Sequence, residues 1–103
     1  MKIAPPEQLR RLIGEVERKL DSLPYAGRLD RPERIARRLD AGAEALARLR
    51  RRKGVKVNDG WGGTALRLGG IHVTCKSRNP ELALQSWLST ARRRLAEIEG
   101  ARA

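Results

Sequence analysis

Residues 64–76 read Thr-Ala-Leu-Arg-Leu-Gly-Gly-Ile-His-Val-Thr-Cys-Lys, and this stretch decides the fold. Apolar and polar side chains alternate on both sides of the central Gly69-Gly70 pair, which is typical of two half-buried antiparallel strands. Glycine adopts the positive φ angles of a two-residue hairpin turn without steric cost. We therefore expect strands at about 64–68 and 71–76. A shorter first strand at about 55–57 would complete an antiparallel meander.

The alternation assigns each side chain of the meander to one of two faces, because successive residues of a strand point to opposite sides. The inner face is expected to hold Val55, Val57, Leu66, Leu68, Ile71, Val73 and Cys75. The outer face is expected to hold Lys56, Ala65, Arg67, His72, Thr74 and Lys76. The outer face is therefore basic and polar, and the inner face needs a covering layer.

Segments with helical periodicity before and after the meander are expected to form that layer. Residues 6–23 carry a single apolar stripe, and Gly14 within it indicates a close crossing with another element. Residues 31–53 form a second helix with Asp30 as its N-cap, and residues 80–99 form a third, capped by Asn79 and stopped by Gly100.

The expected buried stripes of the second and third helices follow the same period. They comprise Ile35, Leu39, Ala43, Leu46 and Leu49, then Leu84, Trp87, Leu88, Ala91, Leu95 and Ile98. The chain is thus predicted to be one α+β domain spanning residues 1–103, with a helical hairpin, a three-stranded meander and a C-terminal helix in the order ααβββα.

Composition narrows the setting of this domain. The single cysteine, Cys75, excludes an internal disulfide and suits a reducing cytoplasm. No apolar run approaches the roughly 20 residues that a membrane span requires. The sequence leaves the oligomeric state open.

The positive charge is concentrated in the middle of the chain. Residues 48–78 contain nine Lys or Arg against one acid, Asp59, which contributes +8 of the net charge of +11. A concentrated basic field attracts polyanions, because neutralising phosphates releases condensed counterions. The predicted nucleic-acid-binding residues are Arg48, Arg50, Arg51, Arg52, Lys53, Lys56, Arg67, His72, Thr74, Lys76 and Arg78.

Each group of candidates also has a structural interpretation. Cations in the last turn of a helix interact favourably with its dipole, which accounts for one or two of residues 48–53. The polar outer face could equally be a solvated surface whose charges guard edge strands against aggregation. If it binds DNA, a small sheet can enter the major groove, where Arg and Lys reach guanine and Thr74 reaches a thymine methyl or a phosphate.

Aromatic residues discriminate between nucleic acids. Single-strand and RNA-binding sheets stack bases on Phe, Tyr or Trp, and the expected outer face has none, which favours duplex DNA over RNA. Trp61 either caps the core beside its glycine-rich turn or provides a stacking platform. Arg92 and Arg93 on the third helix are possible secondary phosphate contacts.

Signals of catalysis are weak. His72 and Cys75 lie three positions apart on one strand, so they are expected on opposite faces and cannot form a local nucleophile pair. No cluster has metal-ligand spacing, and the glycines at 60–63 lack the pattern of a Walker loop. We therefore predict a protein that is not an enzyme and needs no cofactor or metal.

Residues 69–94 resemble a pattern found in small accessory proteins of transposable and temperate bacteriophages. The matching features are the Gly69-Gly70 turn, the following strand, Trp87 and Arg92-Arg93. The meander followed by a helix is also similar in layout to the arm-type DNA-binding domains of phage integrases. The phage resemblance implies that the protein acts in the bacterial cytoplasm. It also implies an alternative function, the inhibition of a host protein or ribonucleoprotein complex, as anti-CRISPR and other anti-defence proteins perform.

The primary hypothesis is therefore non-enzymatic binding of duplex DNA, with the phage-type inhibitor as the alternative. A third interpretation is a homodimeric scaffold that associates through its last helix. The primary hypothesis requires one arrangement: the end of the second helix, at residues 50–53, must lie beside the outer face of the meander.

Overall fold

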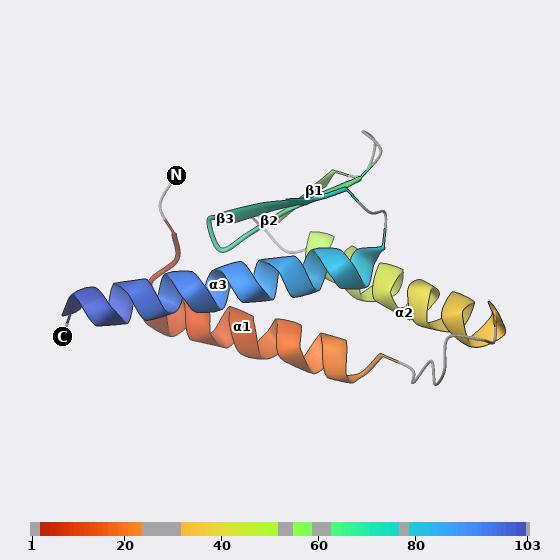
Figure 1. The fold of residues 1–103 in the computed structure, drawn as a ribbon, viewed down its shortest axis with the longest axis horizontal. Helices are drawn as coiled ribbons and strands as arrows, with labels where there is room; N and C mark the ends of the chain where they lie inside the picture. The colour runs from red at the N-terminus through yellow and green to blue at the C-terminus, as the bar shows by residue number, and fades with distance from the viewer. Residues whose placement is uncertain (1–2, 24–31, 52–54, 59–62, 77–78, 103) are drawn as a thin grey trace.

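The computed structural model describes residues 3–23, 32–51, 55–58, 63–76 and 79–102. Its elements follow the predicted order of two helices, three strands and a final helix (Figure 1). They are α1 (Pro6–Asp21), α2 (Pro32–Arg50), β1 (Lys56–Asn58), β2 (Thr64–Leu68), β3 (Ile71–Cys75) and α3 (Pro80–Arg102). The α+β fold class is confirmed.

The three strands form one antiparallel sheet in the order β1-β2-β3. Gly69 and Gly70 turn the hairpin with φ angles of 61° and 79°, as the sequence predicts. In the resulting register Leu66 lies opposite Val73, and Leu68 lies opposite Ile71. All four of these side chains are buried, so the predicted inner face of the hairpin is confirmed.

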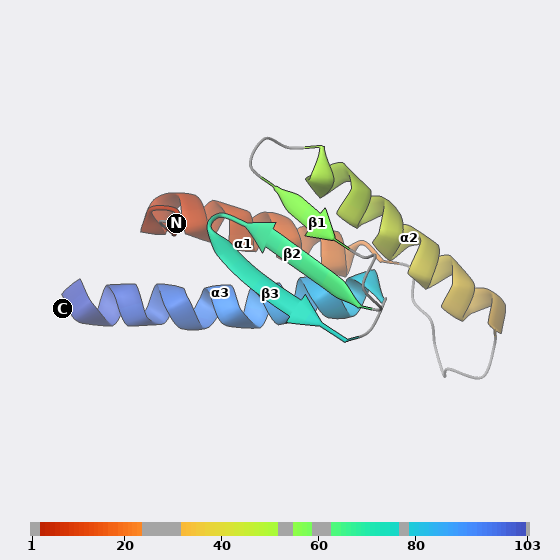
Figure 2. The same ribbon diagram turned by 90° about the horizontal axis from the view of Figure 1, so that it is seen from above.

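The helices form a layer that covers one face of the sheet (Figures 1 and 2). Helices α1 and α3 run in opposite directions, and two ion pairs join them, Arg10 to Glu99 and Glu17 to Arg92. The sheet and all three helices share one core, whose largest fully buried side chains are Trp87, Leu9, Leu49, Leu66, Leu84 and Val16. Helix α3 therefore packs against both the sheet and α1.

Trp87 is the central link between α3 and the sheet. Its side chain is fully buried, and its indole Nε1 donates a hydrogen bond of 3.0 Å to the carbonyl oxygen of Leu68. The bond ends at the last residue of β2, next to the hairpin turn. Because a buried indole N–H needs a partner, this contact fixes the depth at which the hairpin sits on the helix.

The hairpin turn is held from its other side by the N-terminal segment. The backbone N–H of Ala4 donates a 2.9 Å hydrogen bond to the carbonyl of Gly69. A Cβ atom added at Gly69 would lie 2.7 Å from Cδ1 of Leu12, so glycine is required here for space as well as for backbone conformation. The turn is thus packed directly against α1.

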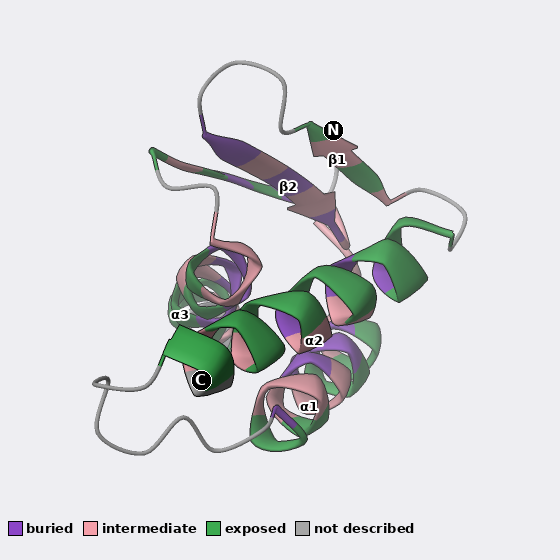
Figure 3. Ribbon diagram, turned by 90° about the vertical axis from the view of Figure 1, so that its right-hand side faces the viewer, coloured by how far each residue is buried: buried purple, intermediate pink, exposed green. Residues whose placement is uncertain are grey.

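Helix α2 departs from its predicted stripe. Leu46 and Leu49 are buried, but Leu39 is 39% exposed and Ala43 is exposed, so the expectation that both lie in the core is wrong. For Leu39 the physical reason is the position of α2, because its N-terminal half projects beyond the start of α3 (Figures 2 and 3). The ion pair between Arg38 and Glu81 ties that half to the first turn of α3.

Two glycine predictions also require correction. The close helix crossing occurs at Gly42, where an added Cβ would lie 3.7 Å from the backbone of Glu81, whereas at Gly14 it would meet only the end of the Arg18 side chain. Gly100 does not stop α3, which continues to Arg102. A glycine without positive φ costs a helix only about 1 kcal/mol relative to alanine, so it does not by itself end one. The predicted N-cap Asn79 is confirmed by the 3.0 Å bond from the Glu81 N–H to its Oδ1.

Candidate nucleic-acid interface

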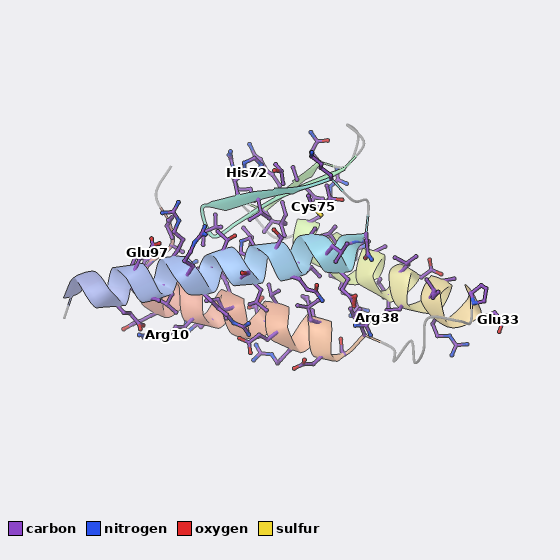
Figure 4. All side chains as sticks on the ribbon, viewed as in Figure 1. Arg10, Glu33, Arg38, His72, Cys75 and Glu97 are labelled. Carbon is purple, nitrogen blue, oxygen red and sulfur yellow. The ribbon has the colours of Figure 1, made fainter. Side chains whose placement is uncertain are left out.

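The side of the sheet that faces away from the helices carries a row of basic side chains. In the strand register Lys56 of β1 lies opposite Arg67 of β2, and Arg67 lies opposite His72 of β3. Lys56 and His72 are exposed, and Arg67 on the central strand is half-buried. Figure 4 shows His72 on the side of the sheet away from the helices and Cys75 on the side toward them. These three residues are called the basic row below.

The basic row concentrates like charges. Directly opposite residues of an antiparallel pair have Cβ atoms about 5 Å apart, and like charges at that spacing are destabilising. The described residues of the sheet, 55–58 and 63–76, include no Asp or Glu. Arg67 also takes part in an interaction within the chain. The row therefore presents three basic side chains on one face of the sheet.

A second row on the same face is small and polar. Asn58 lies opposite Ala65, and Ala65 lies opposite Thr74. Asn58 and Thr74 are exposed, and Lys76, also exposed, lies just beyond the end of β3. The predicted first strand ended at residue 57, so sequence reasoning missed Asn58. Continuing the Lys56-Val57 alternation by one residue would have found it.

The end of α2 reaches the basic row. Arg50 lines a shallow surface depression of about 810 Å³ together with Lys56, Arg67 and His72. The rest of the lining comes from Val55, Val57 and Asn58 in and just before β1, and from Ala65 on the central strand β2. Of the described residues at the helix end, Arg50 thus lies beside the outer face of the sheet, as the primary hypothesis requires.

The other basic residues near the helix end are distributed differently. Arg48 points to Glu44, at 2.7 Å, and lines a groove between α1 and α2 instead of the depression. Arg51 is exposed in the turn after α2. The remaining candidates, Arg52, Lys53, Arg78 and Trp61, lie outside the described residues.

The two candidates on α3 are not brought together with the basic row. Arg92 is 3.1 Å from Glu17 and so is directed toward α1, while Arg93 is exposed. Glu97 pairs with Arg94 at 3.6 Å, not with Arg93 as i,i+4 spacing suggests. The structure therefore separates this arginine cluster from the depression on the sheet.

Groups that could do chemistry are sparse in the part of the chain that the structure describes. No three His, Cys, Asp or Glu side chains among those residues come together in a group that could hold a metal ion. His72 is exposed on the outer face and Cys75 is half-buried on the other face. None of the described helices is both long enough and apolar enough to span a bilayer.

Comparisons with known proteins find no match, so the functional assignment depends on the geometry of the structure. No protein-family model, no curated protein and no solved structure matches this chain. The resemblance of residues 69–94 to phage accessory proteins stays a prediction. The functional argument therefore depends on the basic row, the adjoining helix end and the depression that they share.

Proposed function

We propose that this protein binds duplex DNA without acting on it chemically, using the outer face of the sheet and the C-terminal end of α2. One observation carries the proposal: Arg50, Lys56, Arg67 and His72, from four different elements, line one depression on an exposed sheet face. A concentrated basic surface attracts polyanions, because neutralising their phosphates releases condensed counterions.

The dimensions of the sheet suit a duplex groove. Three strands spaced about 4.8 Å apart place the outer strands about 10 Å from each other, and the major groove is about 12 Å wide. In that pose Arg67, on the central strand, faces the base edges, and Arg50 and Lys56 at one margin face phosphates. Asn58 and Thr74 add an amide and a hydroxyl to the same face.

The surface favours a duplex over a single strand. Single-strand recognition needs rings on which unpaired bases stack. Among the described residues, the outer face of the sheet presents no Phe, Tyr or Trp, and Trp87 is buried in the core. Contact with phosphates and base edges is therefore the interaction that this face offers.

Fluorescence anisotropy with random duplexes of about 20 base pairs, with single strands and with RNA tests the proposal across about 50–300 mM salt. Four phosphate contacts give a log–log slope of about −3.6, which is roughly a 600-fold loss of duplex affinity over that range. Lys56→Gln should flatten the slope by about one unit. The matched control is Arg37→Gln, because Arg37 is also exposed but lies on the projecting half of α2.

Some results would contradict the proposal or favour its alternative. Failure to bind any of the three nucleic acids at the lowest salt would remove it, as would an equal change of slope in the Arg37→Gln control. A stoichiometric protein captured from nuclease-treated bacterial extract, and retained at high salt, would favour the alternative prediction of an inhibitor that binds a host protein or ribonucleoprotein complex.

A further inference from the structure

The depression beside β1 has the composition of a site for a single phosphate group. Its basic lining consists of Arg50 from α2, Lys56 from β1, Arg67 from β2 and His72 from β3. An arginine presents a planar fork of donors that matches phosphate geometry, and a lysine adds a compact point charge. Side chains from four elements thus surround one space, whereas a general basic surface would spread them out.

One member of this lining differs from the others in its chemistry. Arg and Lys stay positive at neutral pH, but a histidine gains or loses its charge near pH 6.5. Among the described residues, the charged groups beside His72 are Arg67 directly opposite, Lys56 one strand further, Arg50 across the depression and Lys76 just beyond the end of β3. No Asp or Glu among the described residues lines the depression.

We infer that this depression is a discrete phosphate subsite and that His72 enters it as the imidazolium, so that binding takes up a proton from the buffer. The inference rests on the proposed function and names the chemical group recognised there. A phosphate close to an imidazole favours the charged ring. By linkage, the complex holds more protons than the free protein, and affinity rises as the pH falls through the histidine range.

The size of the effect follows from the coupling. If phosphate prefers the charged ring about tenfold, binding is up to about tenfold tighter at a pH where the ring is charged than at a pH where it is neutral. The same coupling requires a net uptake of up to one proton per bound phosphate between these limits.

Proton NMR reads this directly, because the chain has one histidine and its C2–H signal reports only on His72. The titration midpoint is measured in chloride, in inorganic phosphate at equal ionic strength, and with excess duplex DNA. We expect the midpoint to rise by about one pH unit with duplex, and to move in the same direction with inorganic phosphate. Anisotropy at pH 6 and pH 8 provides the matching affinities.

Two variants make the test specific to this side chain. His72→Gln should bind duplex equally at both pH values, and His72→Lys should keep the tighter binding at both. If the duplex binds but the midpoint does not move, or if His72→Gln keeps the pH dependence, the subsite is overturned and the proposed function stands. If no duplex binds at low salt, the proposed function falls, and the inorganic phosphate arm then shows whether the depression is a phosphate site for another ligand.

Discussion

The hairpin turn that aligns the basic row offers a direct test of the packing. Gly69 and Gly70 both have positive φ, so alanine at either position meets the left-handed backbone penalty of about 1–2 kcal/mol. At Gly69 the new Cβ would also lie 2.7 Å from Leu12 Cδ1. Overpacking of this kind costs about 1–3 kcal/mol more.

We therefore expect Gly70→Ala to lower the free energy of unfolding by about 1–2 kcal/mol and Gly69→Ala by about 2–5 kcal/mol. Urea denaturation followed by tryptophan fluorescence and by circular dichroism measures both, with equal m-values as the condition for comparing them. The two variants change the same turn by the same methyl group, so each controls for the other. A loss at Gly69 no larger than about 1–2 kcal/mol, which is the backbone penalty alone, would refute the inferred packing of the turn against α1.

Three further variants test separate links of the argument. Trp87→Phe removes the indole N–H that donates the 3.0 Å hydrogen bond to the Leu68 carbonyl. It should lower the free energy of unfolding, measured by urea denaturation, by about 2–3 kcal/mol. A negligible change would show that this bond does not stabilise the fold. Arg67→Gln should lower affinity for a preferred duplex by about 1–3 kcal/mol and weaken discrimination at one base pair, measured by competition with single-base variants; unchanged discrimination would remove Arg67 from base contact. Glu81→Gln removes the partially buried partner of Arg38 and should cost about 1 kcal/mol, with protection from hydrogen exchange lost first in the projecting half of α2.

The Glu81→Gln variant has a matched control in Glu44→Gln, which also removes the carboxylate partner of an arginine on α2. Glu44 forms an i,i+4 ion pair with Arg48, and both side chains are about two-thirds exposed, at 65% and 66%. Because exposed helical pairs contribute only about 0.3–0.5 kcal/mol, Glu44→Gln should have a much smaller effect than Glu81→Gln. Equal effects would mean that the Arg38–Glu81 contact does not tie α2 to α3.

The hairpin and α3 were predictable because their signals are local. Alternation around Gly69-Gly70 sets both the strands and their faces, and Asn79 followed by Pro80 marks the start of α3. These patterns depend on backbone geometry within a few residues, so no knowledge of the partner surface is needed. The same reasoning placed the three basic-row residues on one face, which the register confirms.

The contacts of α2 were not predictable from its period. Its stripe includes Leu39 and Leu46 equally, but only the half that overlaps the other elements can bury its apolar side chains. Where α2 meets α3, Gly42 faces Pro80 and Glu81, and a Cβ added there would make ordinary contacts at 3.7 Å. A glycine inside a helix indicates either a close approach or a tolerated cost, and sequence alone does not separate them.

The candidate site shows the same division between local and tertiary information. The sequence indicates that Arg48 and Arg50 are both basic residues at a helix end, yet only Arg50 lines the depression, and Arg48 pairs with Glu44. The difference is the two-residue separation, which turns their side chains to different sides of the helix. Which side faces the sheet depends on how the helix is docked, and that is a tertiary property.

The fold leaves the outer face of the sheet without a packing role and holds it rigidly in place. The inner face is fixed to α3 by the Trp87 bond and to α1 through the turn at Gly69. Side chains on such a frame lose less conformational freedom when they bind a ligand than side chains on a loop would. A row of like charges at about 5 Å spacing does not stabilise the free protein. The elements that hold Lys56, Arg67 and His72 together therefore preorganise this face for the anionic partner proposed above. Proton uptake at His72 would distinguish a phosphate bound in this depression from diffuse attraction to the whole basic surface.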